Sequence, residues 1–451
     1  MFALLRFLRI TQSITKSVNI SKMKTKTNRR NFLKTTAVAA IGMPTLIPAS
    51  ALGKNGAVAP SNRIVVGGIG LGPRGRKVLA GFFAHKDCQF IAIADVQKER
   101  REIIKRLADR EYGNSDCVIY DDMSGVLERD DIDSVIIATG DRWHTTASIK
   151  AARAGKDIYC EKPCAMSIQE CQQLDKEIKK HKRVFQAGTQ RRSVPNFKLA
   201  AHLAKSGKLG QVTAVHAGIL QLQDYLEPLP AEPEPHPSDI NWDKWLGPSP
   251  WMEFNAAYCR GRWRNHAGLY AAWRLPEWGS HTIDLCQWAA DADGTTPIEF
   301  EAESDGMITA KYANGAKLVM RLSGFEGEGD WQEGLGTCPI RFEGDEGWVE
   351  AGDAKKIVAS NPKLIKNEKY DQITGTDPVM HVRDFLDCVK TREQPVCNST
   401  AVRYGHMACF AAAISWKLGR KVTFDPKKER FVNDAEANHM RTYTRRKPYT
   451  I

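Results

Sequence analysis

The sequence predicts an α/β fold with two domains. The first has a parallel sheet, and the second is an α+β domain with a large, mostly antiparallel open sheet. Short apolar strand patterns alternate with helical patterns up to about residue 185, which is typical of a parallel sheet covered on both faces by helices. From residue 186 longer runs alternate between apolar and polar residues. A length of 451 residues fits two domains after a leader. We therefore expect domains at 62–185 and 186–451.

The first domain begins with a β-branched strand that runs directly into a glycine-rich loop. Its strands are predicted at 62–68, 88–94, 133–139 and 156–160. Its helices are predicted at 74–85, 97–109, 145–154 and 167–182. In the second domain, strand patterns occur at 211–222, 298–311 and 317–322, and helical patterns at 381–392 and 400–418. Residues 226–238 hold five prolines and several acidic residues, which predicts a loop.

The net charge of +12 is concentrated in the first 51 residues, which contain nine Lys or Arg and no acidic residue. Without that segment the charge is +3 (12 minus 9), so the composition argues against nucleic-acid binding.

The first 51 residues are similar to a twin-arginine signal peptide, with Arg29-Arg30, an apolar run and then Ala49-Ser50-Ala51. We expect a signal at 1–51, a linker at 52–61 and a periplasmic location; the alternative is a disordered basic tail. No segment predicts a membrane span in the mature chain.

The eleven cysteines predict neither a disulfide framework nor a metal site. Their number is odd, and none forms a C-x-x-C pair, since Cys160 and Cys164 are four residues apart. A chain exported in the folded state does not depend on disulfides. From the number and spacing of the cysteines we therefore expect neither a disulfide framework nor a bound metal.

The glycine loop after the first strand predicts a dinucleotide site. Gly70 permits a tight turn, Gly72 lets the backbone approach a pyrophosphate, and Gly75 lets the next helix pack on the strand. The helix N-terminus then faces the phosphates. Asp95 ends the second strand, where an acidic residue binds the ribose 2′-hydroxyl and favours NAD over NADP, although NADP stays open. The alternative is a glycine turn in an unrelated α/β protein.

Three further motifs identify a family resemblance. They are Ala138-Thr139-Gly140-Asp141-Arg142-Trp143-His144, Glu161-Lys162-Pro163 and Gly188-Thr189-Gln190-Arg191. Together with the glycine loop they resemble the Gfo/Idh/MocA oxidoreductases (glucose–fructose oxidoreductase, inositol dehydrogenase and relatives) over residues 62–425. The first domain is then a Rossmann domain that binds NAD. The residues expected to contact the cofactor are Gly70, Gly72, Arg74, Gly75, Asp95, Thr139, Trp143, His144, Glu161, Lys162 and Gln190.

The resemblance also implies the catalytic residues. Lys162 points at substrate and cofactor, and an acid four residues before a histidine corresponds to Glu277 and His281. The usual acid is Asp, so Glu277 departs from the pattern, as does Gly140 in place of the usual Pro. The spacing of Glu277, His281 and Asp284 is i, i+4 and i+7, which places them on one face of a helix. A histidine between carboxylates can be tuned as a base near neutral pH; the alternative is a packing cluster.

We expect hydride transfer between a sugar or polyol carbinol and nicotinamide. His281 takes the hydroxyl proton, Lys162 stabilises the developing alkoxide, and Glu277 orients His281 or binds a neighbouring hydroxyl. Seven of the eleven tryptophans fall within 241–288, where aromatic faces can stack on sugar rings or pack in a core. The residues expected to bind substrate are Arg191, Trp263, Arg264 and Asp284.

Two other functions are open. Some family members are glycosidases with a retained redox cofactor, but their Gly-Gly-His-Gly-Gly stretch is absent here. The other alternative is a non-catalytic sugar-binding protein. The presence of both Lys162 and His281 argues against it, because a non-catalytic copy need not keep them. Because the periplasm has no free NAD pool, we expect the cofactor to be bound tightly before the twin-arginine machinery exports the chain, with residues 52–61 lying over it. We also expect a homo-oligomer.

Overall fold

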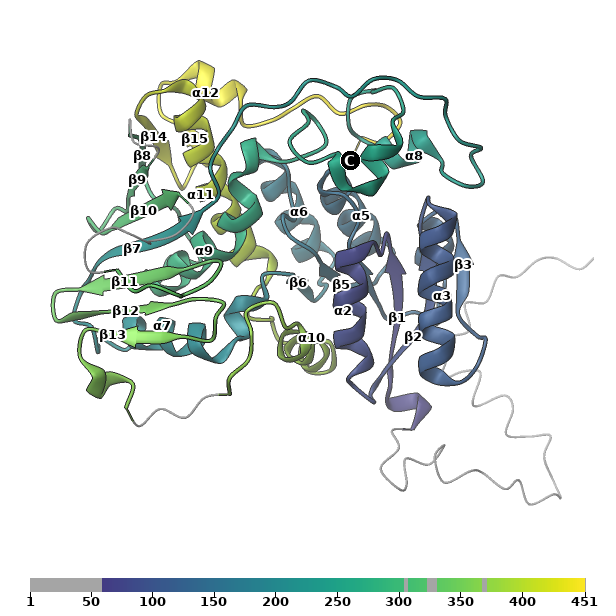
Figure 1. Ribbon diagram of the computed structural model, residues 1–451, viewed down its shortest axis with the longest axis horizontal. Coiled ribbons are helices and arrows are strands. Elements are labelled where there is room, and N and C mark those ends of the chain that lie inside the picture. Colours follow the sequence, from purple (N-terminus) through teal and green to yellow (C-terminus); the bar gives the residue numbers. More distant parts are fainter. Residues whose placement is uncertain (1–58, 304–306, 323–330, 367–370, 451) are drawn as a thin grey trace, which may run out of the picture.

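The computed structural model describes residues 59–303, 307–322, 331–366 and 371–450 (Figure 1). The predicted signal at 1–51 and most of the predicted linker lie outside the described residues. Two sheets form the molecule, one of six strands and one of nine. They confirm the predicted fold class, a Rossmann-type parallel sheet followed by a mostly antiparallel one.

The first sheet has the order β3-β2-β1-β4-β5-β6, and every neighbouring pair is parallel. Its strands are β1 (Ile64–Ile69), β2 (Cys88–Ala94), β3 (Val118–Tyr120), β4 (Ser134–Ile137), β5 (Asp157–Cys160) and β6 (Phe185–Ala187). Its helices are α2 (Pro73–Phe83), α3 (Lys98–Tyr112), α4 (Ser124–Leu127), α5 (Asp141–Arg153) and α6 (Ile168–Lys180). The central strands are buried on both faces, as a doubly covered parallel sheet requires.

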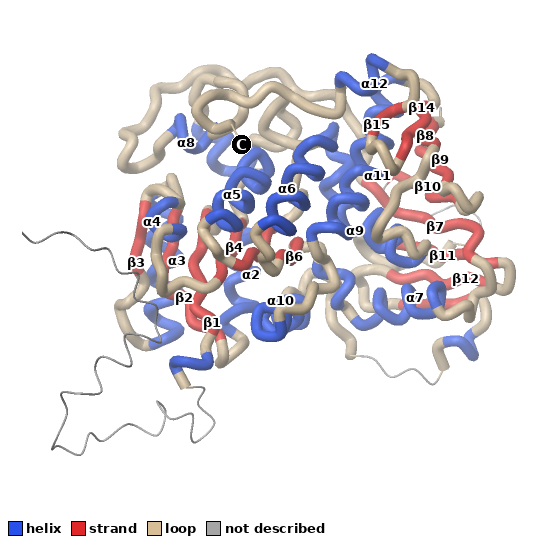
Figure 2. The backbone as a smooth tube through the Cα atoms, turned by 180° about the vertical axis from the view of Figure 1, so that it is seen from behind, coloured by secondary structure: helices blue, strands red, loops and turns tan. Residues whose placement is uncertain are grey.

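Helices cover both faces of this sheet. α5 and α6 lie on one face (Figure 2), whereas α2 and α3 lie on the other. α10 (Val379–Thr391), from far along the chain, joins α2 there through Val382, Phe385 and Leu386. The last strand, β6, extends to Ala187, so the predicted boundary at 185/186 falls within this strand.

The second sheet has the order β13-β12-β11-β7-β10-β9-β8-β14-β15. Its pairs are antiparallel except β7 with β10. Its strands are β7 (Val212–Ile219), β8 (Glu299–Ala302), β9 (Ile308–Lys311), β10 (Lys317–Leu322), β11 (Ile340–Gly344), β12 (Gly347–Ala351), β13 (Ile357–Ala359), β14 (Val422–Asp425) and β15 (Arg430–Phe431). The alternating pattern predicted at 298–311 corresponds to two strands, β8 and β9, which pair antiparallel.

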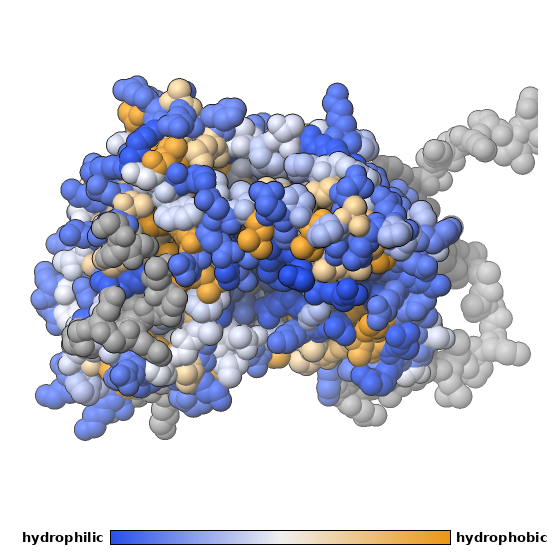
Figure 3. Space-filling model, turned by 45° about the horizontal axis from the view of Figure 1, so that its top comes forward, coloured by the Kyte–Doolittle hydropathy of each residue, from blue (hydrophilic) through white to orange (hydrophobic). Residues whose placement is uncertain are grey.

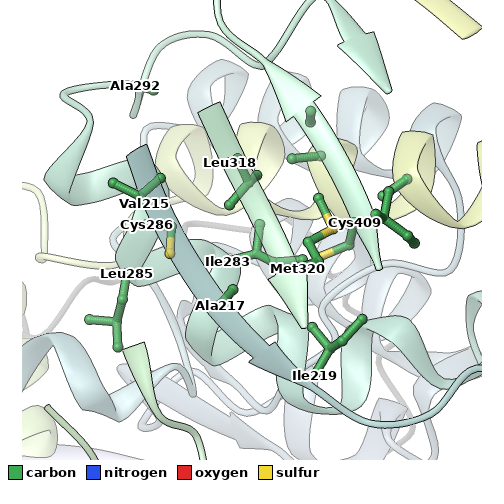
Figure 4. Packing of buried hydrophobic residues seen from close by; sticks show 14 of the residues in the cluster. Val215, Ala217, Ile219, Ile283, Leu285, Cys286, Ala292, Leu318, Met320 and Cys409 are labelled. Atoms are coloured by element: carbon green, nitrogen blue, oxygen red, sulfur yellow. The ribbon is translucent and has the colours of Figure 1, made fainter. Parts of the chain in front are cut away.

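Three helices bury the inner face of the nine-stranded sheet: α7 (Pro195–Lys205), α9 (Leu275–Ala289) and α11 (Ser399–Leu418). Alternate residues of β7 point at them, so Val215, Ala217 and Ile219 meet Ile283 of α9 in one apolar cluster (Figure 4). α9 is thereby fixed between the two domains, and its first turns reach the carboxyl end of the parallel sheet.

A long excursion, residues 226–270, leaves the second domain and lies over the carboxyl ends of the parallel strands (Figure 1). We call it the cap. It contains α8 (Trp242–Leu246), whose tryptophans pack with Phe254 and Tyr258 in a small core of their own. The backbone of Asn241 donates to Val96, and that of Lys98 donates to Asp239, which ties the cap to the end of β2.

The remaining elements are short. They are α12 (Ala435–His439), the 3-10 turns at Pro60–Asn62, Gln190–Ser193, Ala272–Arg274 and Pro362–Leu364, and a π turn at Tyr258–Arg262. With the cap turned forward, the surface is mostly hydrophilic, with hydrophobic side chains in small patches (Figure 3). No helix in the described part of the chain is long and apolar enough to cross a membrane. All eleven cysteines lie within the described ranges, and each is buried and free.

Candidate active site

The glycine loop has the geometry that close packing against β4 requires. Gly70 has φ +68°, and a Cβ there would collide with the side chain of Thr139. A Cβ on Gly75 would lie 3.0 Å from that of Ala138, so this glycine sets the distance between α2 and β4. α2 begins at Pro73 directly after the loop, and its free N–H groups therefore face the expected pyrophosphate position.

A pocket at the ends of β1, β2 and β4 has the residues that an adenosine ribose needs. It is lined by Gly70 of the loop, by Asp95, Gln97 and Arg100, and by Trp143. Asp95 accepts a hydrogen bond from the Gln97 backbone at 2.9 Å through Oδ1, but its buried Oδ2 has no partner among the described residues. Burial raises the pKa of Asp95 to about 6, against the opposing charge of Arg100. An unpartnered buried carboxylate oxygen beside a glycine cradle fits the ribose hydroxyls of NAD.

The cap and the C-terminal segment close this adenosine pocket. Trp143 Nε1 donates to the Lys244 carbonyl at 2.9 Å, and Lys244 Nζ pairs with Asp122 at 2.7 Å. Arg142 donates twice to the Trp245 carbonyl, at 2.9 and 2.8 Å. Tyr449 packs edge-on against Trp143, with ring centroids 5.3 Å apart. The predicted cover at 52–61 lies almost entirely outside the described residues.

Two residues expected at the cofactor serve the protein itself. His144 places its ring nitrogens 2.7 Å from the Pro163 carbonyl and 3.2 Å from the Thr139 carbonyl, so it fastens two loops together. Glu161 accepts from Arg74 Nε at 2.9 Å, and this pair joins β5 to the first turn of α2. Both nitrogens of His144 face backbone oxygens, and its contact with the cofactor stays a prediction.

Lys162 and His281 meet at the carboxyl end of β5. Lys162 Nζ donates to the Glu277 carbonyl at 2.6 Å, which links β5 to α9. Burial lowers the pKa of Lys162, while Glu161, Glu277 and Asp141 oppose that shift. Burial also lowers the pKa of His281 well below its usual value, and the positive charges of Arg191 and Lys162 act in the same direction. His281 is therefore neutral at physiological pH and can accept a proton.

The face of α9 that sequence spacing predicted separates into three roles. Glu277 pairs with Arg274, 3.5 Å from its Nε, whereas the buried Nδ1 of His281 has no partner in the described part of the chain. Asp284 receives Nε and Nη2 of the fully buried Arg192 at 2.7 and 2.8 Å. Each carboxylate thus pairs with an arginine, and the orienting role of Glu277 and the substrate role of Asp284 stay predictions.

The residues around the expected nicotinamide position carry spare hydrogen-bonding capacity. Gln190 donates to the Gly375 carbonyl at 3.1 Å, and its buried Oε1 meets no donor from the described residues. Arg191 binds both oxygens of Asp353 at 2.8 and 2.5 Å, which leaves its buried Nη1 without an acceptor within the described ranges. Leaving these buried polar atoms without hydrogen-bond partners costs free energy in the ligand-free protein. They are therefore suited to binding a polar ligand.

The two predicted substrate residues of the cap lie side by side. The Arg264 guanidinium is 4.6 Å from the Trp263 ring, and Arg264 itself is exposed. The charge of Arg264 also acts on Asp141 and Tyr270, so it faces the same cluster from above.

Sequence reasoning missed two residues of this cluster, Asp141 and Tyr270. Burial raises the pKa of Asp141 to about 7 although Lys162 and Arg264 oppose the shift, and its buried Oδ2 has no partner among the residues described. Burial likewise raises the pKa of Tyr270, with the charges of Glu277 and Asp141 adding to it. Asp141 stands inside the motif that carried the resemblance; Tyr270 gave no signal, because only the cap's path brings it here.

The arrangement is a buried, charged cluster next to a nucleotide pocket. Lys162 donates to a backbone carbonyl and feels the charges of three carboxylates, His281 has a pKa well below its usual value, and Arg191 offers a spare donor. Among the described residues no group of three or more His, Cys, Asp or Glu side chains could hold a metal ion. The fold and the site together define a two-domain, dinucleotide-binding oxidoreductase.

Comparison with known proteins gives the family. Residues 63–189 match the family model "Oxidoreductase family, NAD-binding Rossmann fold", and residues 224–451 match "Oxidoreductase family, C-terminal alpha/beta domain". The chain belongs to the Gfo/Idh/MocA oxidoreductase family. Its cofactor domain is an NAD-binding one, as the glycine loop and Asp95 predicted.

Curated relatives match over part of the chain. A glycosyl hydrolase family 109 protein of Solibacter usitatus is 31% identical over 161 residues, 33% of this chain and 36% of that protein. A 2,7-anhydro-N-acetylneuraminate hydratase of Mediterraneibacter gnavus is 32% identical over 102 residues, 23% of this chain and 27% of that protein. The matches thus span about a quarter to a third of those relatives.

Solved structures share the whole fold. A levoglucosan dehydrogenase in complex with NADH and levoglucosan has a TM-score of 0.56 at 17% identity, covering 80% of this chain and 99% of its own. An aldose-aldose oxidoreductase from Caulobacter crescentus has the same TM-score and identity, covering 80% and 100%. At this identity the likeness establishes the fold alone.

Proposed function

We propose that this protein is an NAD-dependent oxidoreductase that transfers hydride between a hydroxyl-bearing carbon of a sugar, polyol or glycoside and nicotinamide. The observation that carries the proposal is the cluster of Lys162, His281, Asp141 and Tyr270 at the carboxyl end of β5, beside the adenosine pocket of Asp95. Ligands of open α/β sheets bind at this edge. The dehydrogenases with this fold act on carbohydrates according to their names, which supports the substrate class.

The chemistry divides between the cofactor and this chain. When bound, NAD⁺ supplies the acceptor for the hydride that leaves the carbinol carbon. His281, neutral because of its lowered pKa, takes the hydroxyl proton, so the C–H and O–H bonds break and a carbonyl forms. Lys162 stabilises the negative charge that develops on the oxygen. Arg191 Nη1 and Arg264 are placed to bind neighbouring hydroxyls.

Activity of the NAD-loaded protein with glycosides and free sugars tests the proposal. We expect NADH and a keto-sugar from wild type, and neither from Lys162→Met, which should still bind NAD because Lys162 does not line the adenosine pocket. A Lys162→Met variant that turns over at the wild-type rate would overturn the assignment.

A second candidate is a redox-assisted glycosidase or lyase that reoxidises its own NADH. The names of the curated relatives, a glycosyl hydrolase family and a hydratase, favour it. It predicts release of free sugar without added cofactor and without net NADH. The same incubation therefore separates the two candidates. A non-catalytic sugar-binding protein would give binding but neither product.

The proposal extends to export and retention of the cofactor. Arg29-Arg30 and the small residues at 49–51 support twin-arginine export to the periplasm. The cap and Tyr449 over the adenosine pocket support tight binding of NAD before export. Self-association through the second sheet is also proposed, since α7, α9 and α11 pack on one of its faces. Sedimentation of the purified protein and analysis of its bound nucleotide test these points.

A further inference from the structure

A second pocket lies on the other side of the reacting cluster, between the cap, the start of α6, α11 and the C-terminal segment. We call it the aromatic pocket. It has a volume of about 390 Å³, within the range of small-molecule sites. Its walls are formed largely by Tyr225, Tyr270, Trp273, Phe410 and Tyr443. Within the described part of the chain it shares no lining residue with the adenosine pocket, so the dinucleotide does not account for it.

Tyr270 connects this pocket to the proposed chemistry. Its ring lines the aromatic pocket, while the charges of Glu277 and Asp141 act on its phenol. The hydroxyl of Tyr270 is buried and faces this acidic side of the cluster, without a well-formed hydrogen bond to any described residue. A ligand in the aromatic pocket would thus lie next to the ring of Tyr270, and a carbinol beside Lys162 would lie next to its hydroxyl.

The wall of the aromatic pocket is built from strained backbone. Ala272, Trp273 and Arg274 have φ values of 41°, 50° and 76°, a left-handed run that is costly for residues with a Cβ. The Trp273 ring stacks on Tyr225, with centroids 5.5 Å apart and planes at 26°. α9, which carries His281, begins at the next residue, so the turn that presents Trp273 also starts the catalytic helix.

The lining has the composition of a sugar site. Flat aromatic faces suit the apolar C–H faces of a pyranose or an aryl group. Ser167, Thr442 and Thr444 add hydroxyl groups that suit the ring's own hydroxyls. Neither a nucleotide phosphate nor an acidic group is favoured, because the described lining holds no Lys or Arg.

We propose that the aromatic pocket binds the second ring of a glycoside whose first ring is oxidised beside Lys162. The substrates are then glycosides or disaccharides rather than free monosaccharides. This inference rests on the proposed function, which it deepens by naming the substrate class.

Binding and turnover with matched ligands test the aromatic pocket. The ligands are methyl and phenyl glycosides and the corresponding disaccharides of glucose, galactose and N-acetylgalactosamine, measured on the NAD-loaded protein. For the sugar that is accepted, we expect the disaccharide or phenyl glycoside to bind about tenfold more tightly than the methyl glycoside, the scale of one aromatic contact.

Trp273→Leu should remove that difference of about tenfold while the methyl glycoside still binds. Trp416→Leu is the matched control, because the Trp416 ring centroid lies 6.4 Å from that of Trp273 but Trp416 does not line the pocket. Retained binding of the methyl glycoside shows that Trp273→Leu is folded. Phe410→Leu, at another lining residue, gives an independent second variant with the same expected loss.

Equal affinity for methyl glycosides and disaccharides in wild type would overturn the inference, as would an unchanged preference in both pocket variants. A loss of self-association in Trp273→Leu with the preference intact would assign the pocket to a contact between copies instead. Binding is followed by saturation-transfer NMR, which does not need turnover. Preference in binding without NADH formation would sink the proposed function and leave the pocket assignment standing.

Discussion

Asp95 provides the sharpest test of the cofactor site, through replacement with asparagine. Burial raises the pKa of Asp95 from 3.8 to about 6. At about 1.4 kcal/mol for each pKa unit, the charged carboxylate costs the NAD-free protein on the order of 3 kcal/mol above pH 6. The amide introduced by Asp95→Asn would keep an acceptor for the Gln97 backbone and carry no charge.

The sign of the pH dependence follows from the direction of this shift. The folded-state pKa lies above the unfolded one, so the wild type loses stability as the pH rises from about 4 to about 6. Asp95→Asn should therefore unfold with a free energy about 2–3 kcal/mol higher than wild type at pH 8 and an equal one near pH 4. Urea unfolding at the two pH values measures the difference. Asp130→Asn is the control, because it replaces an exposed carboxylate outside the adenosine pocket. It should leave the free energy of unfolding unchanged at both pH values.

NAD binding should change in the opposite direction. A hydrogen bond to a charged group contributes about 1.5–3 kcal/mol, so Asp95→Asn should bind NAD roughly ten- to a hundredfold more weakly. Its preference for NAD over NADP should narrow, because the 2′-phosphate no longer meets a carboxylate. Calorimetric titration of the nucleotide-free protein gives both constants. A more stable variant that binds NAD as the wild type does would refute the assignment of Asp95 to the ribose.

Four further outcomes follow from the geometry. Gly70→Ala should weaken NAD binding and lower stability by more than about 1 kcal/mol, from its φ of +68° and the collision with Thr139; thermal unfolding with and without NAD measures both. Asp141→Asn should remove an ionisation near pH 7 from the kcat/KM profile, because the carboxylate that supports Lys162 forms only above that pH; a profile identical to wild type would exclude Asp141 from the cluster. Asp284→Asn should cost about 1.5–3 kcal/mol of stability by removing one of the two carboxylates that pair with the buried Arg192, Asp293 being the other, without changing the KM of folded protein; a raised KM with unchanged stability would support its substrate role. Tyr449→Ala should release NAD about two- to tenfold faster in stopped-flow exchange, the scale of one edge-on aromatic pair; an unchanged rate would show that the tail does not retain the cofactor.

Local sequence patterns predicted the glycine loop and the elements around it, because these elements depend on residues that are close in the sequence. A buried strand, a glycine turn and a helix start follow one another in sequence from Ile64 to Phe83, and Asp95 ends the next strand. Each of these features depends on neighbours a few residues away. The two three-residue strands β3 and β6 were not predicted, and neither was the six-stranded order that includes them.

The second domain and the details of the site depend on contacts that no local pattern contains. β11 and β12 are five-residue strands rich in charge and glycine, and their hydrogen bonds come from each other and from β7 and β13. Spacing placed Glu277, His281 and Asp284 on one helix, but Arg192, 92 residues before Asp284, decided what that carboxylate binds. The course of the cap is likewise set by distant backbone bonds such as Asn241 to Val96.

Hydride transfer itself is tested most directly by mixing the NAD-loaded protein with a glycoside deuterated at its carbinol carbons. Hydride transfer predicts NADH carrying deuterium, a keto product that has lost one deuterium, and neither of these in Lys162→Met. Release of free sugar with unlabelled NAD at the end of the reaction would favour the redox-assisted glycosidase. An unchanged glycoside and an unlabelled cofactor, across sugars that the protein binds, would contradict the account.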